Sequence, residues 1–72
     1  MLPVLTGTIS ELHRDRGTGS IRGDDGRMYT FRRAALKDAW FHELSEGQQV
    51  TFAAPKPPPH FEAVDVTIVR EP

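Results

Sequence analysis

The residues of this chain that are best suited to binding chemistry are basic side chains concentrated in its first half. From His13 to Lys37 the sequence carries seven arginines and lysines against three aspartates, although the formal charge of the whole chain is −1. From Asp38 onward the balance reverses and acidic residues predominate. Guanidinium groups bind phosphates and stack on planar rings. We therefore expect an anionic partner to dock on the first half. The candidate contacts are Arg14, Arg16, Arg22, Arg32, Arg33 and Lys37.

The same basic residues have an alternative interpretation as a solvated surface. Exposed strands need polar side chains in any case. Acidic residues that could pair with the arginines stand close in the sequence: Glu11, Asp15, Asp24 and Asp25. Such pairing would leave little free anion-binding surface, so the charge pattern alone leaves both interpretations open.

Three aromatic residues form a second group of candidates. Trp40 and Phe41 lie in a polar loop, and Phe61 follows a run of prolines. Aromatic rings stack on nucleobases, and Trp is enriched at protein-binding hot spots. We predict that these rings bind bases or anchor a protein partner. The alternatives are that Trp40 or Phe41 caps the interior against Leu36 and Leu44, and that Phe61 begins a strand with its ring inward.

The sequence disfavours other chemistries. His13, His42 and His60 lie on separate predicted loops without metal-ligand spacing, and no nucleophile motif accompanies them. Cysteine is absent. No apolar run approaches the ~20 residues of a membrane helix, and Met1–Val4 lacks the pattern that starts a signal peptide. We expect a cytoplasmic protein that is not an enzyme, with no cofactor, no metal, no small-molecule substrate and no membrane partner.

Turn-forming residues divide the chain into short segments, most of which have the two-residue period of strands. Strands are predicted at 4–13, 17–23, 27–33, 48–54 and 61–69. Asp24-Asp25-Gly26 is the strongest local signal, because Asp-Gly supplies the positive φ values of a tight hairpin turn. Arg33–Asp38 predicts a single helical turn. Ala39–Gly47 is predicted as a connecting loop and Pro55–Pro59 as a stiff extended bridge.

Alternation within the strands predicts the direction of each side chain. In the first strand one side holds Leu5, Gly7, Ile9 and Glu11, and the other holds Thr6, Thr8, Ser10 and Leu12. The predicted core consists of Ile9, Ile21, Tyr29, Phe31, Leu36, Val50, Phe52 and Val66, with Leu36 closing one end. The hairpin of the second and third strands then presents outward Thr18, Ser20, Arg22, Thr30 and Arg32.

The order of these elements and several motifs resemble the cold-shock domain family. The motifs are Gly7-Thr-Ile-Ser-Glu-Leu12, Arg16-Gly-Thr-Gly-Ser-Ile-Arg-Gly-Asp-Asp-Gly26, Tyr29-Thr-Phe-Arg-Arg-Ala-Ala-Leu36, Phe41-His-Glu-Leu-Ser-Glu-Gly-Gln-Gln-Val-Thr-Phe52 and Ala63-Val-Asp-Val66. The resemblance implies one all-β domain over residues 1–72, a five-stranded barrel of the oligonucleotide/oligosaccharide-binding (OB) type with a short helical turn after the third strand. It also implies single-stranded RNA or DNA as partner, since the family stacks bases on aromatic rings of its first three strands.

Most of those aromatic rings are replaced in this chain. The family's first motif usually reads Lys-Gly-Phe-Gly-Phe-Ile, whereas this sequence has Arg16-Gly-Thr-Gly-Ser-Ile21. Thr and Arg residues replace the Phe, His and Phe of the second motif, and Glu11-Leu12 replaces a Trp-Phe pair. Each stacked base is worth about 1–3 kcal/mol. The losses predict weak, salt-sensitive binding that is driven by arginines.

The resemblance and the charge pattern together predict the nucleic-acid-binding residues. They are Arg14, Arg16, Thr18, Ser20, Arg22, Thr30, Arg32, Arg33, Lys37, Trp40, Phe41 and Phe61. The alternative is a regulatory or protein-interaction barrel that no longer binds nucleic acid. Glu11, within the former stacking platform, favours the alternative because a carboxylate repels phosphates. The basic residues around it favour nucleic-acid binding.

Overall fold

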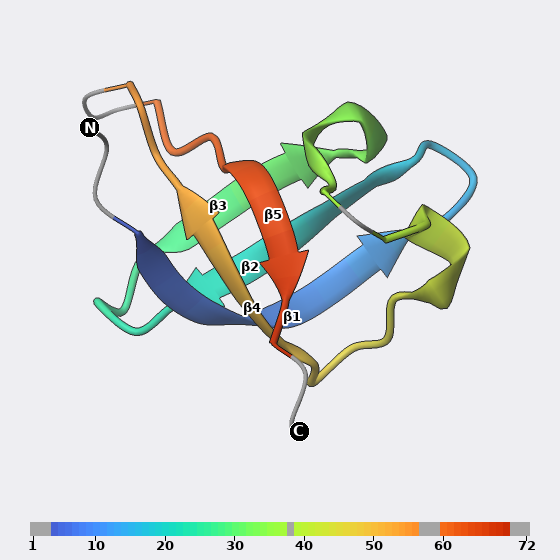
Figure 1. Cartoon of the computed structure of the whole chain (residues 1–72), viewed down its shortest axis with the longest axis horizontal. Coiled ribbons are helices and arrows are strands. Elements are labelled where there is room, and N and C mark those ends of the chain that lie inside the picture. The colour runs from blue at the N-terminus through green and yellow to red at the C-terminus, as the bar shows by residue number, and fades with distance from the viewer. Residues whose placement is uncertain (1–3, 38, 57–59, 70–72) are drawn as a thin grey trace.

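The computed structural model describes residues 4–37, 39–56 and 60–69 and shows an all-β chain of five antiparallel strands (Figure 1). The strands are β1 (Leu5–His13), β2 (Thr18–Gly23), β3 (Met28–Arg32), β4 (Gln49–Ala53) and β5 (Val64–Ile68). Their order in the sheet is β3-β2-β1-β4-β5. The predicted all-β, OB-like fold is confirmed, although β5 begins at Val64 rather than at Phe61.

The sheet curls strongly, so that β4 and β5 cross over β1–β3 in Figure 1. Backbone bonds draw the ends of the sheet together. The N–H of Thr30 donates to the C=O of Phe61 at 2.9 Å, and the N–H of Ala63 donates to the C=O of Thr30 at 2.7 Å. The N–H of Lys37 donates to the C=O of Val66 at 2.8 Å. These bonds bring residues near β5 alongside β3, which sequence distance alone would not suggest.

The predicted hairpin turn joins β2 to β3. The N–H of Gly26 donates to the C=O of Gly23 at 2.9 Å, and the N–H of Gly23 donates to the C=O of Arg27 at 2.8 Å. Gly26 has a φ of +85°, which glycine adopts without steric cost. The turn is therefore a loop over residues 24–26 that ends on a left-handed glycine, one of the common hairpin connections.

The inward side chains form one core. Seven of the eight predicted core residues are at most 4% exposed: Ile9, Ile21, Tyr29, Phe31, Val50, Phe52 and Val66. Leu36 is only half-buried and packs against the margin of the core, where it bridges to β5 beside Val66. Phe41, Leu44 and Ala63 are also buried in the core. The core is thus larger than the strand pattern predicts.

The last residues of β1 depart from the strict alternation, which places Glu11 on the side of Ile9, whereas the resemblance places Glu11 on the outer stacking platform. Ile9 pairs with Ile21 of β2, but Glu11 pairs with Ser20, because a β-bulge lies between Ile9 and Glu11. The bulge reverses the alternation. Glu11 is consequently exposed, and Leu12 packs against the core. A strict two-residue period cannot anticipate such an extra residue.

Two 3-10 turns connect β3 to β4. The first, Arg33–Ala35, stands where the helical turn is predicted, and the second, Phe41–Glu43, lies inside the predicted loop. In the second turn the Glu43 carboxylate accepts a hydrogen bond from the Trp40 N–H at 3.2 Å. The predicted helical turn is therefore shorter than expected, and the loop is more ordered than expected.

Parts of two predictions fall outside the described residues. Asp38, the predicted end of the helical turn, is one, and Pro57–Pro59 of the predicted stiff bridge are the others. Across the described ranges, no helix is long and apolar enough to cross a membrane.

Candidate nucleic-acid interface

Three rows of side chains cross β1, β2 and β3 on the face opposite to the core. The rows are His13–Thr18–Arg32, Glu11–Ser20–Thr30 and Thr8–Arg22–Met28. On β2 the neighbours of these residues along the strand are buried, as the alternation of a strand requires, and Thr30 of β3 likewise lies between the buried Tyr29 and Phe31. The structure thus confirms the outward direction predicted for Thr18, Ser20, Arg22, Thr30 and Arg32.

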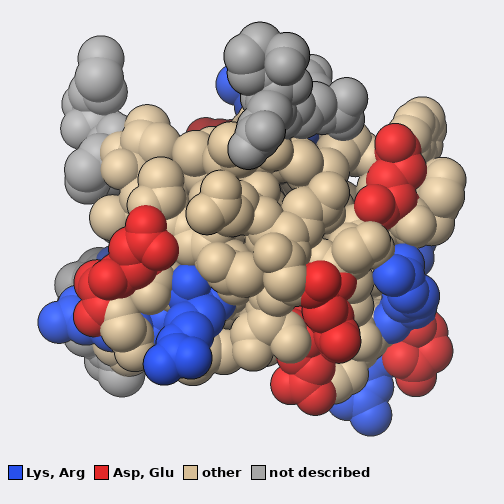
Figure 2. Space-filling model, turned by 90° about the horizontal axis from the view of Figure 1, so that it is seen from below, with Lys and Arg blue, Asp and Glu red and all other residues tan. Residues whose placement is uncertain are grey.

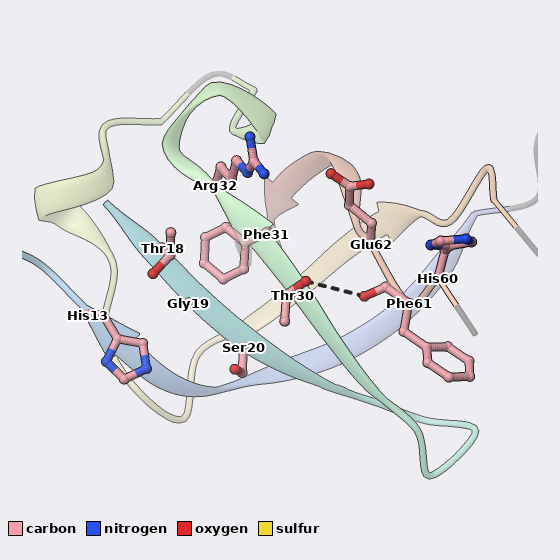
Figure 3. A pocket seen from close by; sticks show the side chains of 10 residues that line it. All are labelled: His13, Thr18, Gly19, Ser20, Thr30, Phe31, Arg32, His60, Phe61 and Glu62. Carbon is pink, nitrogen blue, oxygen red and sulfur yellow. Dashed lines mark hydrogen bonds between the residues drawn. The ribbon is translucent and has the colours of Figure 1, made fainter. Parts of the chain in front are cut away.

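A groove of about 490 Å³ lies over two of these rows (Figure 3). Its lining comes from β1, β2, β3 and the segment before β5: His13, Thr18, Gly19, Ser20, Thr30, Phe31, Arg32, His60, Phe61 and Glu62. In Figure 3 His13 and His60 lie at opposite ends, with Ser20 and Thr30 between them. The groove occupies the face on which the resembled family carries its stacking rings.

The floor of the groove depends on a close approach between β2 and a core ring. A Cβ atom at Gly19 would lie 2.7 Å from the Cε1 atom of Phe31 and 2.9 Å from the carbonyl oxygen of Glu11. Phe31 is 1% exposed, so its ring belongs to the core although it borders the groove. The side chains beside this floor, Thr18 and Ser20, are short and end in hydroxyls, which leaves the space above it open.

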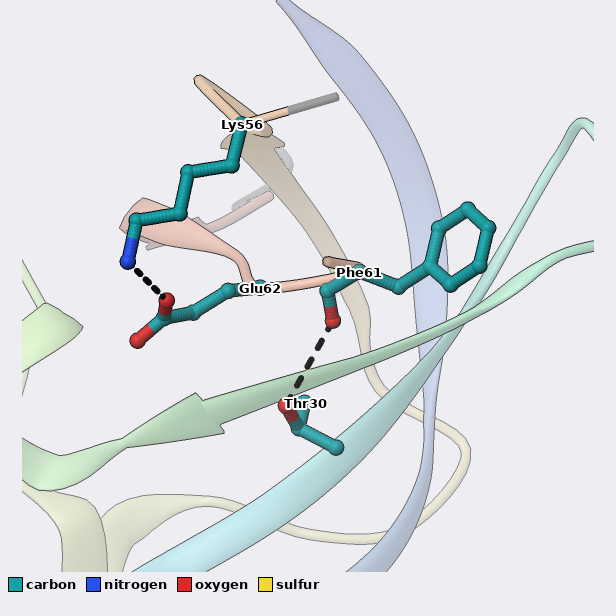
Figure 4. A network of polar contacts seen from close by, with 4 residues as sticks. All are labelled: Thr30, Lys56, Phe61 and Glu62. Atoms are coloured by element: carbon teal, nitrogen blue, oxygen red, sulfur yellow. Dashed lines mark hydrogen bonds and ion pairs between the residues drawn. The ribbon is translucent and has the colours of Figure 1, made fainter. Parts of the chain in front are cut away.

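Residues 60–62 form one rim of the groove, and Figure 4 shows the polar contacts of Phe61 and Glu62 there. The Oγ1 atom of Thr30 donates to the C=O of Phe61 at 3.4 Å. The Lys56 ammonium donates to the Glu62 carboxylate at 3.1 Å, and this hydrogen bond lowers the pKa of the Glu62 carboxyl. Glu62 is therefore ionised at neutral pH, and Lys56 partly neutralises its charge.

Phe61 is a half-buried ring at this rim. It meets the Tyr29 ring edge-on, with 5.8 Å between the ring centres, and the Arg27 guanidinium lies 5.8 Å from its centre. It precedes β5 and is not part of it. The interpretation of Phe61 as the start of the last strand is therefore wrong, whereas its contact with Tyr29 does place it at the edge of the core.

A second hollow, of about 530 Å³, lies beside the turn Phe41–Glu43. Trp40 is 70% exposed, and its ring stacks on His42 with 6.4 Å between the ring centres. Phe41 is 6% exposed and packs 6.1 Å from the Phe31 ring. The prediction of Phe41 as a base-stacking ring is wrong, because the core covers it. The alternative, that one of these two rings caps the interior, is confirmed.

Two of the predicted anion-binding arginines serve the fold. Arg14 donates through Nη2 to the C=O of Leu44 at 2.7 Å and through Nη1 to that of His42 at 3.4 Å. The guanidinium of Arg33 lies 5.8 Å from the centre of the Phe41 ring. Both guanidinium groups contact the loop between β3 and β4. They therefore help to hold this loop in place and are not part of the groove lining.

The remaining basic candidates are dispersed. Arg22 lies in the row next to the groove, and Arg16 lies in the turn between β1 and β2. Lys37 lines an adjoining hollow, which shares Arg32 and Glu62 with the groove. Figure 2 shows basic and acidic side chains in alternating groups on the face seen there. The structure thus brings Thr18, Ser20, Thr30, Arg32 and Phe61 together in the groove but does not gather the basic residues into one patch.

Three titratable side chains of the groove, those of His13, His60 and Glu62, are absent from the predicted site. His13 ends β1, and the bulge determines its outward direction. His60 and Glu62 reach the groove only because backbone bonds join Phe61 and Ala63 to β3. No local sequence signal marks that approach. Among the described residues, no group of three or more His, Asp or Glu side chains is placed to hold a metal ion.

Comparison with known proteins relates the chain to one family. No family model matches it. It is 39% identical over 46 residues to Cold shock protein 1 of Lactiplantibacillus plantarum, a match that covers 64% of this chain and 70% of that protein. A structure of residues 10–88 of CusF from Escherichia coli with Ag(I) is similar, with a TM-score of 0.63 over 97% of this chain and 94% of that one. At 11% identity the likeness to CusF shows the fold alone. The sequence match shows that the chain belongs to the cold-shock protein family.

Proposed function

We propose that this chain binds single-stranded nucleic acid along the groove on the outer face of β1–β3, weakly and with an affinity that depends on salt. The observation that carries the proposal is the position of the groove. It lies over the two rows of β1–β3 that contain Thr18, Ser20, Thr30 and Arg32. These residues stand at or beside the positions of the stacking rings in the resembled family. The relation to a cold shock protein supports the same partner class.

Arg32 supplies the permanent positive charge of the groove. Its side chain is exposed, and a guanidinium can donate two parallel hydrogen bonds to a phosphate or lie flat on a base. The hydroxyls of Thr18, Ser20 and Thr30 donate and accept hydrogen bonds, so they suit phosphate oxygens and base edges alike. This lining favours contacts to the strand that carry little sequence preference.

The expected weakness follows from what the groove lacks. Each lost stacking position forfeits about 1–3 kcal/mol per base, and two such losses at the lower end weaken binding about thirtyfold. Apart from its two histidines, the groove lining carries one positive charge, on Arg32, and one negative charge, on Glu62. Attraction to phosphate is therefore local to Arg32, and because the slope for single strands is about −0.7 per phosphate contacted, salt should weaken it only severalfold.

The proposal is tested by fluorescence anisotropy of a labelled oligothymidylate at low and at physiological salt. Wild type should bind saturably at low salt and more weakly at physiological salt. Arg32→Ala should weaken binding about tenfold, as expected for the loss of one charge-assisted contact. Arg16→Ala removes the same charge from the turn between β1 and β2, outside the lining of the groove, and should change affinity less than about twofold. Equal losses in the two variants would contradict the groove as the binding site.

Trp40 favours a second candidate function, an interface for a protein partner. Its ring is 70% exposed beside a hollow, and exposed Trp side chains are enriched at binding hot spots. A complex isolated from cells should then be lost in Trp40→Ala and retained in Arg32→Ala. The reverse pattern would favour the groove.

A further inference from the structure

We propose that His13 and His60, in their protonated form, bind phosphates of the single strand at the two ends of the groove, so that binding is coupled to proton uptake. The inference rests on the proposed function, because it assigns new contacts within the same groove. Neither histidine belongs to the set predicted from the sequence. We assign them phosphate binding because they lie at the two ends of the groove (Figure 3).

His13 lies in the same row as Arg32. It is the last residue of β1 and pairs with Thr18 of β2, which in turn pairs with Arg32 of β3. Its side chain is 43% exposed, so the imidazole is accessible to a strand that lies over the row. A phosphate bound by Arg32 would therefore lie toward the end of the groove that His13 closes.

The charged groups around His13 come from three elements. The Glu11 carboxylate of β1 lies 3.8 Å from its Nε2 atom. Arg32 of β3 occupies the same row. Glu46, from the loop before β4, accepts a hydrogen bond from the Leu12 N–H at 3.4 Å on the neighbouring residue. A bound phosphate must compete with Glu11 for the protonated imidazole, which limits the affinity that His13 can add.

His60 stands at the other end, next to residues that β3 holds in place. It is exposed, and the following residue, Phe61, is bonded through its backbone to Thr30. The nearby charged groups are Glu62, Lys56 and Arg32, and the Lys56 ammonium engages the Glu62 carboxylate at 3.1 Å. Because Lys56 already pairs with Glu62, a protonated His60 remains available to a phosphate.

Protonation of these two side chains changes the charge of the groove from balanced to positive. The charges of Arg32 and Glu62 offset each other, so each proton that a histidine of the groove takes up adds net positive charge. Histidine is in general the side chain whose ordinary charge change falls between pH 5 and 8. For single strands the slope of log affinity against log salt is about −0.7 per phosphate contacted. Two added contacts should therefore steepen this slope by about 1.4 in acid.

The fold itself should not change over this pH range. A hydrogen bond from the Tyr29 hydroxyl lowers the pKa of the Asp25 carboxyl, and one from Lys56 lowers the pKa of the Glu62 carboxyl. Both carboxylates therefore stay ionised in mild acid, and their contacts persist. A change in affinity between neutral pH and mild acid then reports on the groove.

The test measures the affinity for a labelled oligothymidylate, whose bases do not titrate in this range, at about pH 7.5 and about pH 5.5 at constant low salt. Wild type should bind about tenfold more tightly in acid, as expected for added charge-assisted contacts. His13→Gln and His60→Gln should each remove part of this gain, and the double variant all of it. His42→Gln is the matched control, since His42 stacks on Trp40 outside the groove, and it should retain the whole gain.

The outcomes separate this inference from the function on which it rests. Equal wild-type affinity at both pH values, or a gain that survives in the double variant, would overturn the role of the two histidines while the groove remained the binding site. Absence of binding at both pH values would overturn the proposed function and this inference with it. Salt titrations at each pH provide a second measurement, and an unchanged slope would also count against the two added phosphate contacts.

Discussion

The inner and outer faces of β1–β3 are built from alternate residues of the same strands, yet they have diverged to very different degrees from the family they resemble. The inner face keeps large apolar side chains that are almost fully buried, among them Ile21 and Phe31. The outer face carries hydroxyls and charges where the family carries rings, and a groove lies over it. The comparison shows that strand alternation separates the residues that specify the fold from those that specify the ligand.

The largest effect on stability is expected when a core ring is removed. This change tests whether the inner face specifies the fold. Phe31→Ala should destabilise the chain by about 3–5 kcal/mol, the usual cost of a buried Phe, which is most of the stability of a small domain. Thr30→Ala, at the neighbouring outward position, should cost less than about 1 kcal/mol. Urea denaturation followed by circular dichroism measures both values. Similar losses would mean that the two faces are not energetically distinct.

Aromatic rings restored to the outer face test whether that face specifies the ligand. The double variant Thr18→Phe with Ser20→Phe should tighten binding to oligothymidylate by about thirtyfold, from about 2 kcal/mol of regained stacking. Its stability should be close to that of wild type because neither position is in the core. Met28→Phe adds a ring to the exposed row beside the groove and serves as the control. A comparable gain in the control would show that any exposed ring suffices.

The arginines allow a finer version of the comparison, between a guanidinium that serves the fold and one that serves binding. Arg14→Ala removes the donor to the carbonyl oxygens of His42 and Leu44 and should cost about 1 kcal/mol of stability. Its effect on oligonucleotide affinity should be small. Arg16→Ala, in the same turn, should change neither quantity appreciably. Thermal denaturation measures the stability of each variant, and anisotropy measures its affinity for the oligonucleotide. A loss of affinity without a loss of stability in Arg14→Ala would contradict the structural role of Arg14.

The smallest effect is expected for Tyr29→Phe, which removes the hydrogen bond between the Tyr29 hydroxyl and the Asp25 carboxylate at 2.7 Å. This bond lowers the pKa of Asp25, so its contribution is present above the ordinary value of about 3.9 and is lost as pH falls through the lowered value. It also raises the pKa of Tyr29, so the contribution is lost again as pH rises above about 10.

The stability difference between wild type and Tyr29→Phe should therefore be constant from roughly pH 5 to roughly pH 9 and shrink on both sides. Denaturation midpoints across this range measure it. A difference that grows in acid would have the opposite sign to the one expected from the lowered pKa of Asp25.

Local pattern predicts the fold well wherever alternation is uninterrupted. Ile21, Tyr29 and Val50 are buried as predicted because each lies in a regular strand between residues that are not buried. Strict alternation is wrong at Glu11 and Leu12, where the bulge reverses it. The prediction also gives Phe41 the wrong role, because the burial of a loop residue depends on which core surface the loop reaches.

The sequence predicts the part of the candidate site that lies on β2 and β3. Thr18, Ser20, Thr30 and Arg32 follow from the hairpin and its alternation. His60 and Glu62 do not, because contacts between residues distant in sequence bring them to the groove. The sequence predicts more anion-binding arginines than the folded chain leaves available. Arg14, for example, donates a hydrogen bond to the carbonyl oxygen of Leu44 in the loop between β3 and β4.

The most direct test of the central claim, that the outer face of β1–β3 binds the strand, is nuclear magnetic resonance mapping of backbone amides during titration with oligothymidylate at low salt. The account predicts that shift changes concentrate at Thr18, Ser20, Thr30 and Arg32 and extend to the rim at residues 60–62. Changes centred on β4 and β5, or on Trp40 alone, would place the partner elsewhere and contradict it.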